Sequence, residues 1–174
     1  IGADFVVAQL EVPFEAIEQA FKIARKQNIT TVLNPAPAIE LPKSLLELTD
    51  IIIPNETEAE LLTGISINNE SDMKETATYF LDLGISAVLI TLGEQGTYCA
   101  YQEQYKMIPA CNVKAIDTTA AGDTFIGAFL SELNKDLSNL ESAIRLANQA
   151  SSLTVQRKGA QASIPTRKEV EAEY

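Results

Sequence analysis

The chain has 174 residues, of which 24 are Asp or Glu, 13 are Lys or Arg and none is His, so its net charge is −11. The absence of His excludes a Ser-His-Asp triad, a Cys-His dyad and a His-ligated zinc site, because each of them needs an imidazole. The acidic balance argues against bulk electrostatic binding of nucleic acid or of an anionic membrane. No apolar run reaches the ~18 residues needed to cross a bilayer.

Length and composition favour one globular domain. The length matches the ~100–200 residues of a typical domain, and the apolar content of 46% permits a proper core. Cys99 and Cys111 are too few and too isolated for a disulfide framework or a zinc cluster, so we interpret them as small buried hydrophobes. No secretory signal is evident, which predicts a cytoplasmic protein. The chain opens at Ile1 close to a predicted strand, which suggests a piece of a longer protein.

Short β-branched runs alternate with amphipathic stripes along the chain. We predict strands at 5–7, 30–33, 51–53 and 87–90, and helices at 13–24, 42–48, 72–83, 121–133, 140–155 and after Pro165. Two prolines make 34–38 irregular, and shorter alternating segments at 97–113 predict an antiparallel edge. Continuous apolar strands suit a parallel sheet covered on both faces. The pattern therefore predicts a three-layer α/β domain with a mostly parallel sheet.

The most informative stretch is Asp117-Thr-Thr-Ala-Ala-Gly-Asp-Thr-Phe125. Small residues precede an amphipathic run here, which predicts a loop that leads into a helix N-terminus. Such a terminus presents unpaired N–H groups and a partial positive charge, which suits a phosphoryl group. Asp123 would then be a carboxylate placed to take a proton from an attacking hydroxyl. The alternative is plain helix capping by Thr118, Thr119 or Asp123.

Three other junctions follow or neighbour predicted strands. Asn55 can cap a helix, with Glu58 completing a capping box or instead organising a magnesium ion through water. The 91–96 turn can present a hydroxyl and amides to a nucleotide, or be a plain β-turn. The basic spot at 157–160 is either solvated surface charge or part of a ligand site. In an open α/β fold, strand-to-helix junctions of this kind meet at one edge of the sheet.

In their order along the chain, these motifs resemble those of the ribokinase-like carbohydrate kinases. Around the 117–123 signature stand Asn34-Pro-Ala-Pro-Ala38, Pro54-Asn-Glu-Thr-Glu-Ala-Glu60, Thr91-Leu-Gly-Glu-Gln-Gly96 and Arg157-Lys-Gly-Ala-Gln161. The first and the last of these look like the ribose-specific members. The resemblance covers essentially the whole chain and implies an α/β/α ribokinase-like fold that is incomplete at its N-terminus. Many relatives carry Gly where this chain has Ala120, a change that adds little bulk.

The resemblance implies ATP-dependent phosphorylation of D-ribose at its 5-hydroxyl. Asp123 would be the base, and the amides of Ala121, Gly122 and Asp123 would form the anion hole. The residues that match other family positions are Asn55, Thr91, Gly93, Gly96, Gly122 and Asn148 for ATP; Glu11 and Asp123 for the sugar; Glu58 for Mg²⁺; and Asp117, Thr119, Thr154, Arg157, Gly159 and Ser163 around a monovalent cation, K⁺.

Family members also carry an N-terminal segment with sugar-binding motifs and a β-sheet lid that builds a homodimer. The resemblance therefore implies that residues 1–174 are the nucleotide-binding and catalytic-base portion of a kinase domain. Two alternatives stay open. The whole protein is another sugar or nucleoside kinase of the family, such as a fructokinase-like enzyme, or the chain in isolation is a non-catalytic ATP-binding module.

Overall fold

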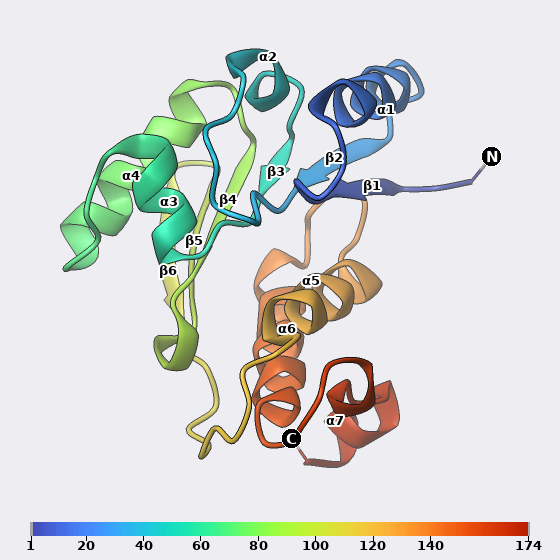
Figure 1. The fold of residues 1–174 in the computed structure, drawn as a ribbon, viewed down its shortest axis with the longest axis vertical. Helices are drawn as coiled ribbons and strands as arrows, with labels where there is room; N and C mark the ends of the chain where they lie inside the picture. Colours follow the sequence, from blue (N-terminus) through green and yellow to red (C-terminus); the bar gives the residue numbers. More distant parts are fainter. Residues whose placement is uncertain (1, 174) are drawn as a thin grey trace. The chain divides into compact units, whose positions relative to one another are not determined.

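The computed structural model describes residues 2–173, which divide into two compact units (Figure 1). The first unit takes in residues up to 92 together with 98–107, and the second takes in 93–97 together with residues from 108 onward. The single-domain organisation expected from the length stays a prediction. Within residues 2–173, no helix combines the length and the apolar character that a bilayer span requires.

A six-stranded sheet in the order β1-β2-β3-β4-β5-β6 is the scaffold of the first unit. Its strands are β1 Phe5–Ala8, β2 Thr30–Leu33, β3 Ile51–Ile52, β4 Ala87–Thr91, β5 Thr97–Tyr101 and β6 Gln104–Ile108. The first four pair in parallel. Only Gln102 and Glu103, both at positive φ, join β5 to β6, a connection that only antiparallel neighbours can use. A mostly parallel sheet with an antiparallel edge is confirmed.

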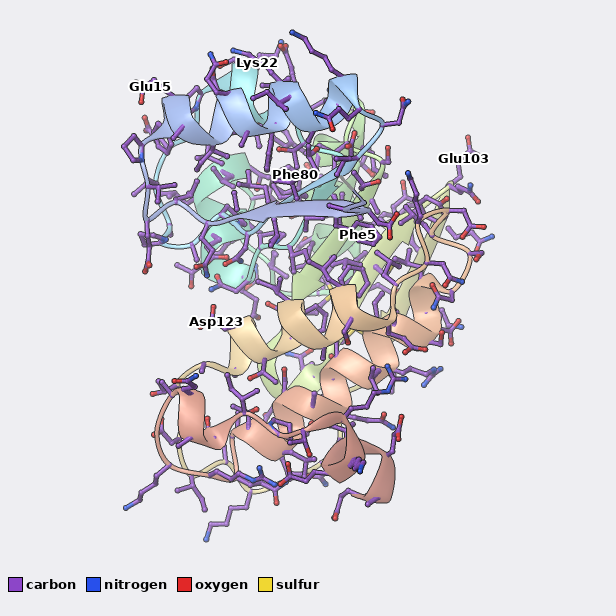
Figure 2. The ribbon with its side chains drawn as sticks, turned by 90° about the vertical axis from the view of Figure 1, so that its right-hand side faces the viewer. Phe5, Glu15, Lys22, Phe80, Glu103 and Asp123 are labelled. Carbon is purple, nitrogen blue, oxygen red and sulfur yellow. The ribbon has the colours of Figure 1, made fainter. Side chains whose placement is uncertain are left out.

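Four helices of the first unit share one core with the sheet. They are α1 Phe14–Lys26, α2 Lys43–Leu46, α3 Glu56–Thr63 and α4 Glu70–Asp82. Phe21 of α1 and Phe80 of α4, the latter labelled in Figure 2, are fully buried in the same apolar cluster as Leu33 and Val88 of the strands. Burying such aromatic side chains contributes about 1.5–3 kcal/mol each.

Three helix starts in the first unit differ slightly from the predicted ones, and α2, predicted at 42–48, is the shorter Lys43–Leu46. Helix α1 begins at Phe14, with Pro13 as the residue before it, because the fixed φ of Pro suits that position. Helix α4 begins at Glu70, two residues before the predicted start, because the Asn69 side chain accepts hydrogen bonds from the N–H groups of Ser71 and Asp72. The helices themselves are confirmed.

The second unit is helical. It contains α5 Ala121–Glu132, α6 Leu140–Thr154 and α7 Arg167–Glu173, with 3-10 turns η1 Gly93–Gln95 and η2 Gln161–Ser163. Helices α5 and α6 pack along each other, and Ala150, Leu153 and Val170 form a small apolar cluster between α6 and α7. The three predicted C-terminal helices are therefore confirmed with bounds that differ by at most two residues.

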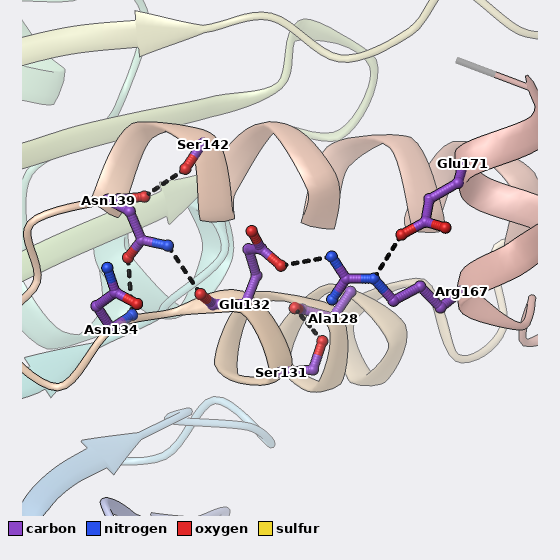
Figure 3. A network of polar contacts seen from close by, with 8 residues as sticks. All are labelled: Ala128, Ser131, Glu132, Asn134, Asn139, Ser142, Arg167 and Glu171. Carbon is purple, nitrogen blue, oxygen red and sulfur yellow. Dashed lines mark hydrogen bonds and ion pairs between the residues drawn. The ribbon is translucent and has the colours of Figure 1, made fainter.

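Polar side chains fasten the far end of α5 to its neighbours (Figure 3). The Arg167 guanidinium donates to Glu132 Oε2 and Glu171 Oε1, each at 2.7 Å. Asn139 Nδ2 donates to the Glu132 carbonyl at 2.8 Å, and Asn139 Oδ1 accepts from the Asn134 N–H at 2.7 Å. Exposed ion pairs contribute only about 0–1 kcal/mol, so these contacts fix orientation more than they add stability.

The two cysteines differ in burial. Cys99 lies on β5 and is 7% exposed, as a small hydrophobe would be. Cys111 is half-buried, because it lies in the irregular segment after β6 rather than on a strand. The expectation of two buried hydrophobes is thus confirmed for Cys99 and wrong for Cys111.

Candidate functional site

In the first unit, polar side chains follow the carboxyl ends of neighbouring parallel strands. Asn34 comes directly after β2, and its Oδ1 accepts from Gln9 Nε2 at 3.2 Å, just after β1. Asn34 Nδ2 donates to the Ile53 carbonyl after β3 at 2.8 Å. Asn55 and Thr91 form a parallel bridge beyond the β3–β4 ladder. These junctions, which follow β1 to β4, meet at one edge of the sheet, and this edge is where ligands bind in open α/β folds. Of the junctions predicted to meet there, Asn55 and Thr91 are brought together, while the 93–96 turn and the 157–160 loop belong to the second unit.

Glu11 lies in the loop that leaves this edge after β1. It is exposed, and the preceding residue, Leu10, donates its backbone N–H to the Ala36 carbonyl at 2.8 Å. The loop of Glu11 is therefore tied to the irregular 34–38 segment. This places a solvent-accessible carboxylate beside the carboxyl end of β2.

The first turn of α3 contains a complete capping box. Asn55 Oδ1 accepts from the Glu58 N–H at 2.9 Å, while Glu58 Oε2 accepts from the Asn55 N–H at 2.9 Å. Glu58 Oε1 also accepts from Asn55 Nδ2 at 2.9 Å. Glu58 is 5% exposed, and this burial raises the pKa of its carboxyl. The capping interpretation is confirmed for this pair.

These contacts limit how Glu58 can hold a metal ion. Each carboxylate oxygen already accepts one hydrogen bond, and no group of three or more His, Cys, Asp or Glu suited to a metal occurs among residues 2–173. A carboxylate oxygen has a second lone pair that can accept a metal-bound water. The arrangement fits Mg²⁺ that keeps several waters and takes its other ligands from phosphates.

The turn at 93–96, in the second unit, requires its two glycines. Gly93 and Gly96 have φ of 55° and 109°, values that side chains disfavour. A Cβ at Gly96 would also collide with the carbonyl oxygen of Ile108. The turn is a short 3-10 segment packed closely against the end of β6, so backbone geometry explains the glycines without a ligand.

Asn148 of α6 is buried and its amide is used inside the second unit. Its Oδ1 accepts from Thr97 Oγ1 at 2.9 Å, and its Nδ2 donates to the carbonyls of Ile108 and Pro109 at 3.1 and 3.2 Å. Both amide protons therefore point to main-chain carbonyls. In this geometry Asn148 holds the residues that follow the 93–96 turn. Neither proton of its side-chain amide is available to donate to the adenine of a nucleotide.

The N-terminus of α5 carries Asp123 in its first turn (Figure 2). The capping residue is Ala120, in the left-handed conformation at φ 61°, and no side chain caps this end. The capping interpretation for Thr118, Thr119 and Asp123 is therefore wrong, because Ala120 occupies the cap position.

The backbone amides at the N-terminus of α5 differ in the hydrogen bonds that they donate. The Ala121 N–H donates to the Thr118 carbonyl at 3.2 Å, and the Thr124 N–H donates to the Ala120 carbonyl at 2.9 Å. The amides of Gly122 and Asp123 stand at positions where an α-helix provides no acceptor four residues back. These two N–H groups are the ones the helix geometry directs outward toward an anion.

Asp117 links the loop before α5 to the loop after α6. Its Oδ1 accepts from the Thr119 N–H and its Oδ2 from the Gly159 N–H, both at 3.0 Å. These hydrogen bonds, first among them the one from Gly159, lower the pKa of Asp117 to about 2. The Asp117 N–H in turn donates to the Val155 carbonyl at 3.1 Å. The structure thus brings Asp117, Thr119 and Gly159 together.

The remaining residues of the expected cation site lie in the same region of chain. Thr154 is fully buried, and its carbonyl accepts from the Arg157 N–H at 3.0 Å. Ser163 Oγ donates to the Ala160 carbonyl at 2.6 Å. These residues supply carbonyl, hydroxyl and carboxylate oxygens, the donors that a hard monovalent cation accepts, so their chemistry fits such an ion.

The Arg157 side chain forms an ion pair with Glu169. Its Nη2 lies 2.8 Å from Glu169 Oε1, and Glu169 Oε2 accepts from the N–H and the hydroxyl of Thr166 at 2.7 and 2.8 Å. These contacts, chiefly the bonds from Thr166, lower the pKa of Glu169 to about 2. The guanidinium is therefore balanced by a carboxylate within the second unit.

Sequence reasoning missed two contacts that hold the start of α5. Ser151 Oγ of α6 donates to the Ala121 carbonyl at 2.9 Å, and Thr154 Oγ1 donates to Thr124 Oγ1 at 3.1 Å. Polar residues at 148, 151 and 154 recur every three positions on α6, which places them along one side of the helix. That spacing was the available signal.

A cavity of about 300 Å³ opens beside Asp123 within the second unit. Its lining combines small or apolar residues with the polar side chains of Asp123, Thr124, Ser131 and Arg167. Arg167 is already paired with two carboxylates.

Comparison with known proteins gives a consistent result across the whole chain. The sequence model of a family described as "pfkB family carbohydrate kinase" matches residues 2–167. A ribokinase from Staphylococcus aureus (strain COL) is 65% identical over 170 residues, which cover 98% of this chain and 56% of that protein. A ribokinase from Haemophilus influenzae is 47% identical over 96% of this chain and 54% of its own length.

A solved structure agrees with these relatives. The structure of Arabidopsis thaliana ribokinase complexed with ribose and ATP is 33% identical, with a TM-score of 0.91 over 98% of this chain and 55% of that one. The chain therefore spans about half the length of the relatives it matches. The expected ribokinase-like α/β fold is confirmed.

Proposed function

Because the chain belongs to the pfkB family of carbohydrate kinases, we propose that the protein transfers the γ-phosphoryl group of ATP to the 5-hydroxyl of D-ribose. The observation that carries the proposal is Asp123 in the first turn of α5, beside outward-directed backbone amides. The high identity to ribokinases supports ribose as the acceptor.

Asp123 is proposed as the base that accepts the proton of the attacking hydroxyl. Phosphoryl transfer proceeds through a loose transition state in which the nucleophile is little bonded, so most of the catalysis comes from positioning and charge stabilisation. A carboxylate placed beside the attacking hydroxyl suffices for such a late proton transfer. The absence of His in the sequence agrees with a reaction whose base is a carboxylate.

The amides at the start of α5 are proposed to bind the transferred phosphoryl group. Those of Gly122 and Asp123 are proposed as direct donors, since amides in the first turn of a helix point toward the site where an anion binds. The Ala121 N–H would join them by leaving the Thr118 carbonyl, a bond that is already long at 3.2 Å. Small side chains at 120–122 allow the phosphoryl group to approach the backbone closely.

The remaining roles follow the family pattern. Asn55, Thr91, Gly93 and Gly96 are proposed to contact ATP, with Asn148 beside the nucleotide as a buried support, and Glu11 is proposed to contact the sugar. Mg²⁺ would neutralise charge on the phosphates when bound, and Glu58 would hold one of its waters. Asp117, Thr119, Thr154, Arg157, Gly159 and Ser163 would hold K⁺ through their oxygens.

The proposal is tested by a kinase assay on the whole gene product in which the chain occurs. Phosphorylation is measured with Mg-ATP and a panel of ribose, 2-deoxyribose, fructose and a nucleoside, in the presence and absence of K⁺. The expected result is preferred turnover of ribose. Preferred turnover of another acceptor would overturn the ribose assignment, and no turnover of any acceptor would overturn the kinase assignment.

Residues 1–174 alone provide a second test. Calorimetry with Mg-ATP is expected to detect binding, while ribose turnover is expected to be absent or far below that of the whole protein. The whole protein is further proposed to be a cytoplasmic homodimer, which light scattering and cell fractionation would check.

A further inference from the structure

The first turn of α5 depends on contacts from outside its own sequence. Its cap residue, Ala120, adopts a left-handed conformation that costs a non-glycine residue about 1–2 kcal/mol, and no side chain caps the helix. Its first residue, Ala121, has a carbonyl that accepts the Ser151 hydroxyl of α6 at 2.9 Å. A neighbouring helix therefore supplies an interaction that the local sequence does not.

Ser151 is unusual among the serines of its own helix. Ser142 Oγ donates to the Asn139 carbonyl and Ser152 Oγ donates to the Asn148 carbonyl, so both bond to their own helix or its start. Such local bonding is the common behaviour of helical Ser. Ser151, which is half-buried, instead donates across to α5.

The bond from Ser151 also acts on a specific amide. The Ala121 carbonyl and the Gly122 N–H belong to one planar peptide group. A hydrogen bond to the carbonyl polarises that group and strengthens its N–H as a donor, because hydrogen bonds in a chain reinforce each other. The Gly122 N–H is one of the two amides that α5 directs outward.

We propose that Ser151 is a positioning residue of the reaction, which orients and polarises the Ala121–Gly122 peptide so that the Gly122 N–H binds the transferred phosphoryl group. This inference rests on the proposed kinase function. Thr154, which donates to Thr124 one turn further along α5, supports the same geometry at 3.1 Å. Because the phosphoryl group moves from the leaving oxygen toward the attacking oxygen, a donor fixed along its path is expected to contribute more in the transition state than in the ATP complex.

The test compares Ser151→Ala with Ser142→Ala in the whole gene product. In Ser151→Ala, kcat is expected to fall about five- to tenfold, the value of one net hydrogen bond, with KM for ATP and for ribose changed less than twofold. Ser142→Ala removes a hydroxyl from the same helix and is expected to keep wild-type kcat. Equal kcat in Ser151→Ala and the wild type, or equal losses in both variants, would overturn the proposal.

Ser151→Thr separates the hydroxyl from side-chain packing. This variant retains a donor and is expected to keep at least half of the wild-type kcat. A loss as large as that of Ser151→Ala would show that packing, not the hydrogen bond, is responsible, and would overturn the proposal.

A second readout does not depend on the reaction. In ¹⁵N-resolved NMR of the wild type and the two alanine variants, the Gly122 amide proton is expected to shift upfield in Ser151→Ala only, because its peptide group is then less polarised. If the wild type fails to phosphorylate any acceptor while this shift occurs, the proposed function fails and the contact through Ser151 stands. An unchanged Gly122 resonance in Ser151→Ala would overturn the positioning role even in an active kinase.

Discussion

Two helix N-termini of this chain are built in opposite ways. Helix α3 starts with Asn55 and Glu58, which satisfy each other's backbone N–H groups within a single turn. Helix α5 starts with a left-handed Ala120 and has no side-chain cap, although Thr118 and Thr119 stand nearby in the sequence. The first end is capped by its own side chains, whereas the second, called here the open end, has no side-chain cap.

The difference indicates how a helix end is reserved for a ligand. A side-chain cap occupies the N–H groups that would otherwise bind an anion, and it adds about 1 kcal/mol of stability. An uncapped end gives up that stability, so other parts of the structure must hold it. Here Ser151 and Thr154 of α6 contact α5, and Asp117 ties the loop before it to Gly159.

The largest expected effect is on the open end. Asp123→Asn removes the proposed base and is expected to lower kcat by about 10²–10⁴-fold, the usual contribution of general base catalysis. The variant is expected to bind Mg-ATP like the wild type, because the amides of α5 are unchanged. A coupled kinase assay and calorimetry check this, and near-native turnover would contradict the assignment of Asp123.

Removing the capping box of α3 is expected to change the stability of the protein. Asn55→Ala removes the cap of α3 and is expected to lower the free energy of unfolding by about 1 kcal/mol. Thr118→Ala changes an exposed residue that caps nothing, so its effect is expected to stay within about 0.5 kcal/mol. Chemical denaturation followed by circular dichroism measures both, and equal effects would remove the contrast between the two ends.

Low pH is expected to remove stabilising contacts of Asp117, near the N-terminus of α5, but not those of Glu58 in the capping box of α3. The folded-state pKa of Asp117 is about 2, below its ordinary value of 3.8, so its contribution to stability is present above 3.8 and is lost as the pH falls toward about 2. The contribution of Glu58 to stability changes with pH in the opposite direction. Burial raises the pKa of its carboxyl, so protonation at low pH removes the cost of burying a charge. Asp117→Asn is therefore expected to lose less stability than the wild type between pH 4 and pH 2.

Unfolding measured over this pH range checks the sign. Glu169 titrates in the same window with a pKa of about 2, so part of the acid sensitivity is expected to persist in Asp117→Asn. An identical pH dependence in the variant and the wild type would show that the link from Asp117 to Gly159 contributes nothing to folding.

The smallest expected effect concerns backbone strain. Ala120→Gly relieves a left-handed conformation worth about 1–2 kcal/mol but adds unfolded-state entropy worth about 0.4–1 kcal/mol, for a net gain of ~0.5 kcal/mol. Gly64→Ala is the matched opposite at the C-terminus of α3, where φ is 73° and a Cβ meets nothing within 4 Å. This variant is expected to lose about 1 kcal/mol in thermal or chemical denaturation.

The sequence by itself determined the elements and the closed helix end. Apolar periodicity placed the strands and helices, and the Asn55–Glu58 spacing predicted a capping box, because those contacts join residues three positions apart. It also placed Asp123 at the start of a helix. These features depend on local chain geometry, which local sequence specifies.

Only the tertiary structure decided how the open end is held and how the predicted site residues are used. The bonds from Ser151 to Ala121, from Gly159 to Asp117 and from Thr97 to Asn148 join residues 30, 42 and 51 positions apart. Nothing in the neighbouring sequence specifies such partners, because they meet only after the helices have packed. The left-handed Ala120 likewise persists because those distant contacts outweigh its local preference.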